Sequence, residues 1–178
     1  MDYKIIRHHR RKKLLLTVSP MGEVAVKAGL LTPLKIIDNF VNANKDWIEK
    51  QQQFFAQKYH TRIITTKAER DSAKKQLLPV MISLVQKYAA VMDVEPKSVK
   101  ITVAEKRWGS CSGRETVCFS YRCYFLSQKC KEYIVIHELS HLKEFNHSND
   151  FYKTVQKYMP DYKQAEKELD GYYIHTEQ

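Results

Sequence analysis

The chain has 178 residues, of which 43% are hydrophobic and 28% charged, and its 30 basic and 20 acidic side chains give a formal net charge of +10. This apolar content suffices for one compact domain or two small ones, and it excludes a disordered or low-complexity chain. No stretch approaches the roughly 18 apolar residues of a membrane span, and no signal peptide core is visible. We therefore expect a cytoplasmic protein with no membrane partner.

The four cysteines, Cys111, Cys118, Cys123 and Cys130, are too widely spaced to form the C-x-x-C pattern of a zinc knuckle or a redox site. Thiols stay reduced in the cytoplasm, and cysteine packs there as a small hydrophobic residue. We interpret all four as structural.

Basic residues are concentrated near the N-terminus, since residues 1–65 carry 12 basic and 5 acidic side chains. They peak in the run Arg7-His8-His9-Arg10-Arg11-Lys12-Lys13. Such a run fits phosphate contacts with a nucleic acid or nucleotide, but it also fits a solvated strand end and turn. We favour the solvated face and keep nucleic acid as a second interpretation.

Residues 3–27 have the alternation of strands, and the Ser19-Pro20-Met21-Gly22 segment between them suits a type I turn. A hairpin is therefore predicted. Thr32-Pro33 predicts a helix start, with Thr32 as the cap, and the apolar residues beyond it recur at helical spacing, as expected of a core-facing stripe. That stripe consists of Ile36, Ile37, Phe40, Val41, Trp47, Ile48, Phe54 and Phe55.

The helical pattern breaks around Tyr59 to Thr66, which predicts two domains, residues 1–65 and 66–178. Thr66-Lys67-Ala68-Glu69 matches a capping box and predicts a second helix that reaches about Met92. Pro79 should kink this helix or end its first part, because proline lacks a backbone donor and clashes with the preceding turn.

Residues 98–104 and 116–126 have strand-like patterns, and Arg107-Trp108-Gly109-Ser110-Cys111-Ser112-Gly113 lies between them. A helix is predicted to start after Ser127 and to run to about Glu144, with a further helix after Ser148 and a last one that ends at Asp170-Gly171.

His137-Glu138-Leu139-Ser140-His141 matches H-E-x-x-H within the helix predicted after Ser127. At about 100° per residue, the two histidines lie roughly 40° apart around the helix and about 6 Å along it, so both imidazoles can reach one metal ion. Glu138 flanks them and can reach a water without binding the metal, as a general base requires.

His147 is the third candidate ligand, because it lies six residues past His141, the offset of the third histidine in H-E-x-x-H-x-x-G-x-x-H. A continuous helix would carry it away, so the chain must turn back after His141. The glycine of that pattern is Glu144 here, and we expect Asn146 to adopt the left-handed conformation instead.

These motifs resemble those of the YgjP-like metallopeptidase family, which is related to SprT-like and other zincin peptidases. The resemblance is carried, in the family's order, by Arg107 to Ser112, by His137 to Glu144, and by Asn146-His147-Ser148 with Phe151 and Met159-Pro160-Asp161-Tyr162 beyond. The N-terminal hairpin and helix are also similar to the family's leading segment.

The resemblance implies an α+β, zincin-like fold in which an antiparallel sheet packs on a central metal-binding helix, preceded by the N-terminal hairpin and helix. It also implies zinc bound by His137, His141 and His147, with Glu138 as the catalytic base. Members usually have a further strand-forming stretch before Glu69, of which only Thr61 to Thr65 remains here.

The Arg107 to Ser112 segment either lines the cleft, with Gly109 allowing close approach and Trp108 forming an apolar wall, or makes a structural turn. We do not expect Cys111 to be a nucleophile, because the metal site supplies an attacking oxygen. Candidates for stabilising an oxyanion are Tyr172, Tyr173 and His175.

The sequence therefore predicts a zinc-dependent hydrolase, most consistent with a metallopeptidase acting on peptides. One alternative is a metal-dependent hydrolase of nucleotide phosphoanhydrides (a pyrophosphatase), which the basic run would suit. The other is a nucleic-acid-associated protease or binding module.

Overall fold

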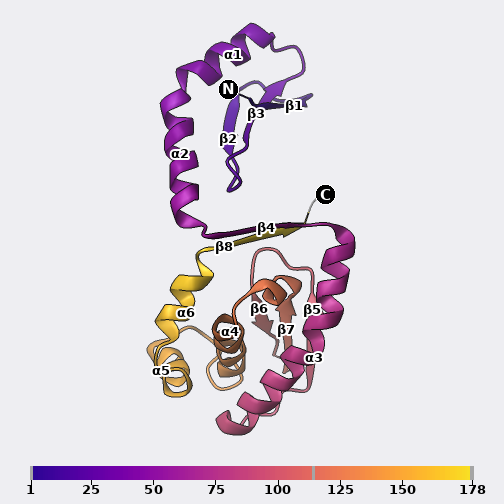
Figure 1. Ribbon diagram of the computed structural model, residues 1–178, viewed down its shortest axis with the longest axis vertical. Coiled ribbons are helices and arrows are strands. Elements are labelled where there is room, and N and C mark those ends of the chain that lie inside the picture. The colour runs from indigo at the N-terminus through magenta and orange to yellow at the C-terminus, as the bar shows by residue number, and fades with distance from the viewer. Residues whose placement is uncertain (1, 114, 177–178) are drawn as a thin grey trace. The chain divides into compact units, whose positions relative to one another are not determined.

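A computed structural model describes residues 2–113 and 115–176, and the chain divides into two compact units, Met1–Arg62 and Ile63–Gln178 (Figure 1). The sequence placed the boundary between residues 65 and 66. None of the helices in the described part of the chain is long and apolar enough to cross a membrane.

The first unit contains a three-stranded sheet of β1 (Lys4–His8), β2 (Leu15–Val18) and β3 (Val24–Gly29), with β3 in the centre. Strands β2 and β3 form the predicted antiparallel hairpin. Its turn is closed by a 2.8 Å hydrogen bond from the Gly22 amide to the Ser19 carbonyl, and Gly22 has a φ of +83°, which a residue without Cβ adopts freely. Strand β1 pairs in parallel with β3.

Two helices, α1 (Leu34–Ala43) and α2 (Lys45–Lys58), replace the single helix expected after Thr32. The predicted cap is also wrong, because Pro33 is the N-cap residue and no side chain caps α1. The predicted apolar stripe is only partly buried. Ile37, Val41 and Ile48 join the core with Val24, Val26 and Ala28, whereas Ile36, Trp47 and Phe54 are exposed.

The remaining elements lie in the second unit, except that the first two residues of β4 precede its boundary at Ile63. They are β4 (Thr61–Thr65), α3 (Lys67–Met92), β5 (Ser98–Thr102), β6 (Gly109–Cys111), β7 (Thr116–Ser120), the 3₁₀ helix η1 (Tyr121–Phe125), α4 (Gln128–Ser140), α5 (Asn149–Tyr158), α6 (Tyr162–Leu169) and β8 (Tyr172–Thr176).

Helix α3 begins with the predicted capping box, in which the Thr66 hydroxyl accepts from the Glu69 amide and the Glu69 carboxylate accepts from the Thr66 amide. Pro79 lies inside α3 and does not end it, so of the two predicted effects the termination is wrong. Pro79 lies on the exposed side, where water can satisfy the carbonyl that proline leaves without a donor.

The sheet of this unit has the order β5–β7–β6, and it is mixed rather than antiparallel, because β5 pairs with β7 in parallel and only β6 is antiparallel. The strand expected over residues 116–126 ends at Ser120, whose hydroxyl accepts from the Arg122 amide and starts η1. The observed class is therefore α+β, with a sheet that differs from the one implied by the resemblance.

Helix α4 packs against α3, α5, α6 and strand β6, so it lies at the centre of the second unit (Figure 1). Strand β4, left open by the sequence, pairs with β8. Buried hydroxyls join these strands to η1: Thr176 Oγ1 lies 3.0 Å from Thr65 Oγ1 and 2.7 Å from the Tyr121 hydroxyl.

Candidate metal site

Helix α4 carries the H-E-x-x-H motif because its sequence defines both ends of the helix. The helix starts after Ser127, as predicted, and the Ser127 hydroxyl caps this start by accepting from the Cys130 amide at 3.2 Å. The helix is apolar on more than one face, with Ile134, Val135 and Ile136 all buried. A helix of this kind can be buried within the unit, with its polar side chains confined to the face that forms the histidine site.

The chain leaves α4 after Ser140, earlier than the predicted end near Glu144. Amide-to-carbonyl bonds from Leu142 to Leu139 and from Lys143 to Ser140, each 3.0 Å, tighten the last turn to a 3₁₀-type geometry. The predicted left-handed Asn146 is wrong, because among described non-glycine residues only Asp93 and Glu115 have positive φ. Tightening of the helix end therefore reverses the chain without a left-handed residue at position 146.

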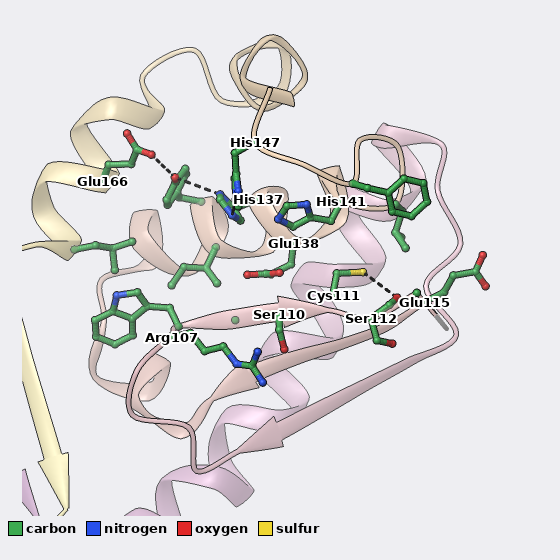
Figure 2. Close-up of a pocket in the computed structure, with 18 of the residues that line it drawn as sticks. Arg107, Ser110, Cys111, Ser112, Glu115, His137, Glu138, His141, His147 and Glu166 are labelled. Atoms are coloured by element: carbon green, nitrogen blue, oxygen red, sulfur yellow. Dashed lines mark hydrogen bonds between the residues drawn. The ribbon is translucent and has the colours of Figure 1, made fainter. Parts of the chain in front are cut away.

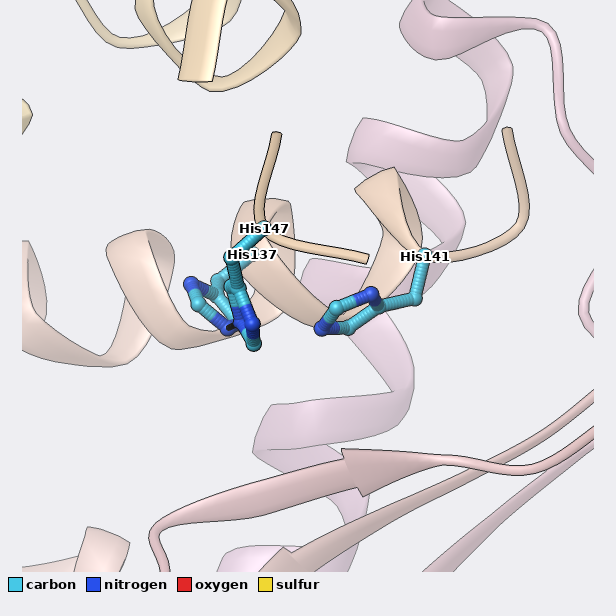
Figure 3. Close-up of side chains that lie close together, drawn as sticks. All are labelled: His137, His141 and His147. Carbon is cyan, nitrogen blue, oxygen red and sulfur yellow. Dashed lines mark hydrogen bonds between the residues drawn. The ribbon is translucent and has the colours of Figure 1, made fainter. Parts of the chain in front are cut away.

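Three imidazoles converge as a result, two from α4 and its end and one from the loop before α5 (Figure 3). One ligand atom from each of His137, His141 and His147 lies within 4.8 Å of the others, and the Nε2 atoms of His137 and His147 are 3.0 Å apart. Nitrogens bound tetrahedrally to zinc at about 2.0–2.1 Å are roughly 3.4 Å apart, so this spacing fits a zinc ion after small side-chain adjustments.

The chemistry of these nitrogens also suits a metal. Burial, followed by the nearby His141 and His147, lowers the pKa of His137 to about 4. Burial likewise lowers the pKa of His141. Neutral imidazoles carry the free lone pair that metal binding requires.

The ring nitrogens that face away from the cluster have partners of their own. His141 Nδ1 lies 3.2 Å from the Glu144 carbonyl, which can only accept, so Nδ1 donates and Nε2 is left free for a metal. His137 Nδ1 lies 3.4 Å from the hydroxyl of Tyr133. The Phe151 ring, from α5, packs against all three imidazoles with centroid distances of 4.6–4.9 Å.

Glu138 projects from α4 toward the strand β6 and is only 5% exposed (Figure 2). Burial raises the pKa of its carboxyl to about 7, against the opposing effects of Arg107 and the Cys111 backbone amide. Gly109 makes room for this carboxylate, since a Cβ at residue 109 would lie 2.5 Å from Glu138 Oε1.

A cavity of about 850 Å³ includes the three histidines, Glu138 and the whole Arg107 to Gly113 segment in its lining. The segment thus lines the cleft and also forms β6, so the two roles that the sequence left open coexist. The guanidinium of Arg122, buried behind it, lies 4.2 Å from the Trp108 ring and supports this wall.

The thiols agree with the structural role predicted for them. All four cysteines are free, and burial raises the pKa of Cys111 to about 11 and that of Cys123 to about 12. Both thiols stay protonated near neutral pH, which disfavours a nucleophilic role.

The C-terminal residues considered for an oxyanion lie elsewhere, since none of Tyr172, Tyr173 and His175 lines the cavity. His175 pairs with Glu105 at 3.1 Å, and the Tyr172 hydroxyl donates to Glu168. Sequence reasoning missed Tyr133 and Glu166, which do line the cavity. Tyr133, one turn before His137, could have been found from helical spacing.

Two ligand histidines one turn apart, a third returned by a turn and a buried glutamate beside them are the combination of metallopeptidases. A family model described as YgjP-like, metallopeptidase domain matches residues 65–172. The chain belongs to this family of metallopeptidase domains, as the sequence resemblance implied.

No curated protein matches this chain significantly. Two crystal structures of metallopeptidase zymogens are similar to it. Abylysin of Pyrococcus abyssi shares 24% identity at a TM-score of 0.47, and the match covers 50% of this chain and 90% of that one. Jannalysin of Methanocaldococcus jannaschii shares 21% identity at a TM-score of 0.44, with the same coverage.

Proposed function

We propose that the protein is a zinc-dependent peptidase with a zincin-like site, in which His137, His141 and His147 hold the metal and Glu138 is the general base. The observation that supports this most is the convergence of three histidine ligand atoms within 4.8 Å, in the same cavity as a buried carboxylate. The cytoplasmic location expected from the sequence stays a prediction.

Three histidine nitrogens are a donor set that suits catalytic zinc. Because these nitrogens are neutral, the zinc ion would keep its full positive charge, which favours the ionisation of bound water. Bound there, zinc would supply a Lewis acid that acidifies water and polarises a carbonyl. Glu138 would take the proton of the attacking water on its carboxylate and pass it to the leaving amine, which breaks the peptide bond. Burial of Glu138 keeps bulk water from competing for that proton.

Two features of the cavity favour a peptide over a nucleotide. Strand β6 is an edge strand of its sheet and borders the cavity, so an extended peptide can lie along it. The lining also contains the carboxylates of Glu115, Glu138, Glu166 and Asp170 against the single guanidinium of Arg107, among the described residues. Even with the two positive charges of a zinc ion added, the ionised carboxylates outnumber the positive charges, which disfavours a polyphosphate. Nucleic-acid contact through the basic run stays a prediction.

The test combines metal analysis with a parallel screen of peptides and nucleoside triphosphates. We expect one zinc per chain and hydrolysis of peptides only. Glu138→Gln should keep the zinc and lose about 100-fold or more in turnover, because the amide cannot accept the proton. Glu95→Gln, at an exposed residue outside the cavity lining, is the matched control.

Two results would contradict the proposal. Near wild-type turnover in Glu138→Gln would remove Glu138 from the mechanism. Hydrolysis of nucleotides without any hydrolysis of peptides would replace the peptidase with the phosphoanhydride hydrolase.

A further inference from the structure

The hydroxyl of Tyr133 lies between a metal-ligand candidate and a carboxylate. Tyr133 is one turn before His137 on α4, and its oxygen lies 3.4 Å from His137 Nδ1. The same hydroxyl is 2.6 Å from Oε1 of Glu166, which comes from α6 (Figure 2). The three groups form a chain from a negative charge to the imidazole.

The direction of the protons in this chain follows from the chemistry of its ends. An ionised carboxylate can only accept, so the phenol donates its proton to Glu166. The phenol oxygen then has only lone pairs to offer His137, and Nδ1 must be the protonated nitrogen. His137 Nε2 is left with its lone pair toward the histidine cluster, where it lies 3.0 Å from His147 Nε2.

The phenol needs the carboxylate because a neutral hydroxyl is a weak acceptor for an imidazole N–H. His141, by contrast, faces a backbone carbonyl, that of Glu144, at 3.2 Å. Donation to a charged group polarises the phenol and strengthens its own lone pairs. The Tyr133 ring is also held in place, since the Tyr162 ring stacks on it with centroids 6.3 Å apart.

We propose that Tyr133 and Glu166 are a positioning pair, in which Glu166 acts through the Tyr133 phenol to fix the Nε2-ligating tautomer of His137 and tighten its bond to zinc. The inference rests on the proposed function, because it needs a metal at the histidine cluster. Both residues line the cavity, but this role needs no contact with the substrate and is measured by metal affinity.

The test measures the zinc dissociation constant by competition with a chromogenic chelator in four variants. Tyr133→Phe should weaken zinc binding about tenfold or more, the range seen for groups that hold a metal-bound histidine. Glu166→Gln keeps an acceptor and loses the charge, so it should weaken binding by a smaller factor of about threefold or more. Tyr162→Phe, in the stacked ring beside Tyr133, is the matched control and should bind zinc like the wild type.

The double variant Tyr133→Phe/Glu166→Gln gives the sharpest result. If Glu166 acts through the phenol, its substitution should change the dissociation constant less than about twofold once the phenol is gone. An equal loss in both backgrounds would show a direct effect of charge and would overturn the relay. Unchanged affinity in Tyr133→Phe would overturn the pair.

A second measurement holds even if Tyr133→Phe folds poorly. Nitrogen NMR of the zinc-loaded wild type should show His137 protonated at Nδ1 and bound through Nε2, and the opposite assignment would contradict the inference. A wild-type protein that binds no zinc would instead overturn the proposed function, so the two failures are distinguishable.

Discussion

The carboxylate of Glu138 fits its position because residue 109 has no side chain. The ideal Cβ of an alanine at Gly109 would lie 2.5 Å from Oε1 and 2.7 Å from Cγ of Glu138. Moving only the carboxylate end of the Glu138 side chain would not relieve these contacts, because Cγ is also too close and the side chain is buried. The observed position of Glu138 therefore requires a residue without a side chain at position 109.

Gly109→Ala should displace Glu138 and lower peptide hydrolysis tenfold or more, about 1.4 kcal/mol in the barrier, while zinc content stays near one per chain. The measurement is turnover together with elemental analysis. Gly113→Ala is the control, because Gly113 lines the same cavity and a Cβ there meets nothing within 4 Å. Wild-type turnover in Gly109→Ala would show that Glu138 need not occupy its observed position.

The three histidines give a second prediction for single residues. His137→Ala, His141→Ala and His147→Ala should each lose most of the zinc, because each removes one of three protein ligands. Elemental analysis after dialysis decides this, with His9→Ala from the exposed basic run as the control. Full zinc occupancy in His147→Ala would show that His137 and His141 suffice to hold the ion and would contradict the assignment of His147 as the third ligand.

At the scale of elements, the start of α3 matters because this helix packs against α4, which carries the site. The Thr66 hydroxyl satisfies the amide of Glu69 in a capping box, while Thr32, at the start of α1, makes no such bond. Two threonines that looked equivalent in the sequence therefore differ in the structure.

Thr66→Ala should lower the free energy of unfolding of the second unit by about 1 kcal/mol, the usual cost of losing a side-chain cap. Thr32→Ala should change the free energy of unfolding of the first unit by no more than about 0.5 kcal/mol. Urea unfolding, followed with a tryptophan in each unit, Trp47 and Trp108, measures both; the other tryptophan in each case is replaced by phenylalanine. Equal losses would contradict the assigned caps.

At the scale of the whole molecule, the proposed chemistry belongs to one unit. Every residue that lines the cavity lies between Arg107 and Asp170, within the second unit, and none belongs to the basic run of the first. The run instead surrounds a shallow surface hollow lined by His8 to Lys13. We therefore expect the proposed hydrolysis not to require its charges.

Replacing Arg10, Arg11, Lys12 and Lys13 with glutamine should leave zinc content and peptide turnover unchanged, because none of these side chains lines the cavity. We also expect little change in DNA binding, measured by fluorescence anisotropy at two salt concentrations, as for a solvated face. Loss of binding together with a flatter salt dependence would show that the run contacts phosphates. A tenfold fall in peptide turnover would contradict the separation of roles.

The sequence by itself predicted the features that depend on local spacing. The H-E-x-x-H motif falls on a helix that starts after Ser127, the capping box at Thr66 is present, and the hairpin turn at Ser19 to Gly22 forms. These succeed because turns, caps and helical periodicity are fixed by neighbours a few residues apart. The family membership followed from motifs of the same local kind.

Only the tertiary structure decided the features that join distant residues. The parallel pairing of β5 with β7, the closeness of Gly109 to Glu138 and the bond from Tyr133 to Glu166 have no signal in local spacing. The same holds for the helix break at Asn44, which the continuous apolar stripe did not indicate. Strand partners and close approaches depend on how the whole chain packs, which periodicity along one segment does not specify.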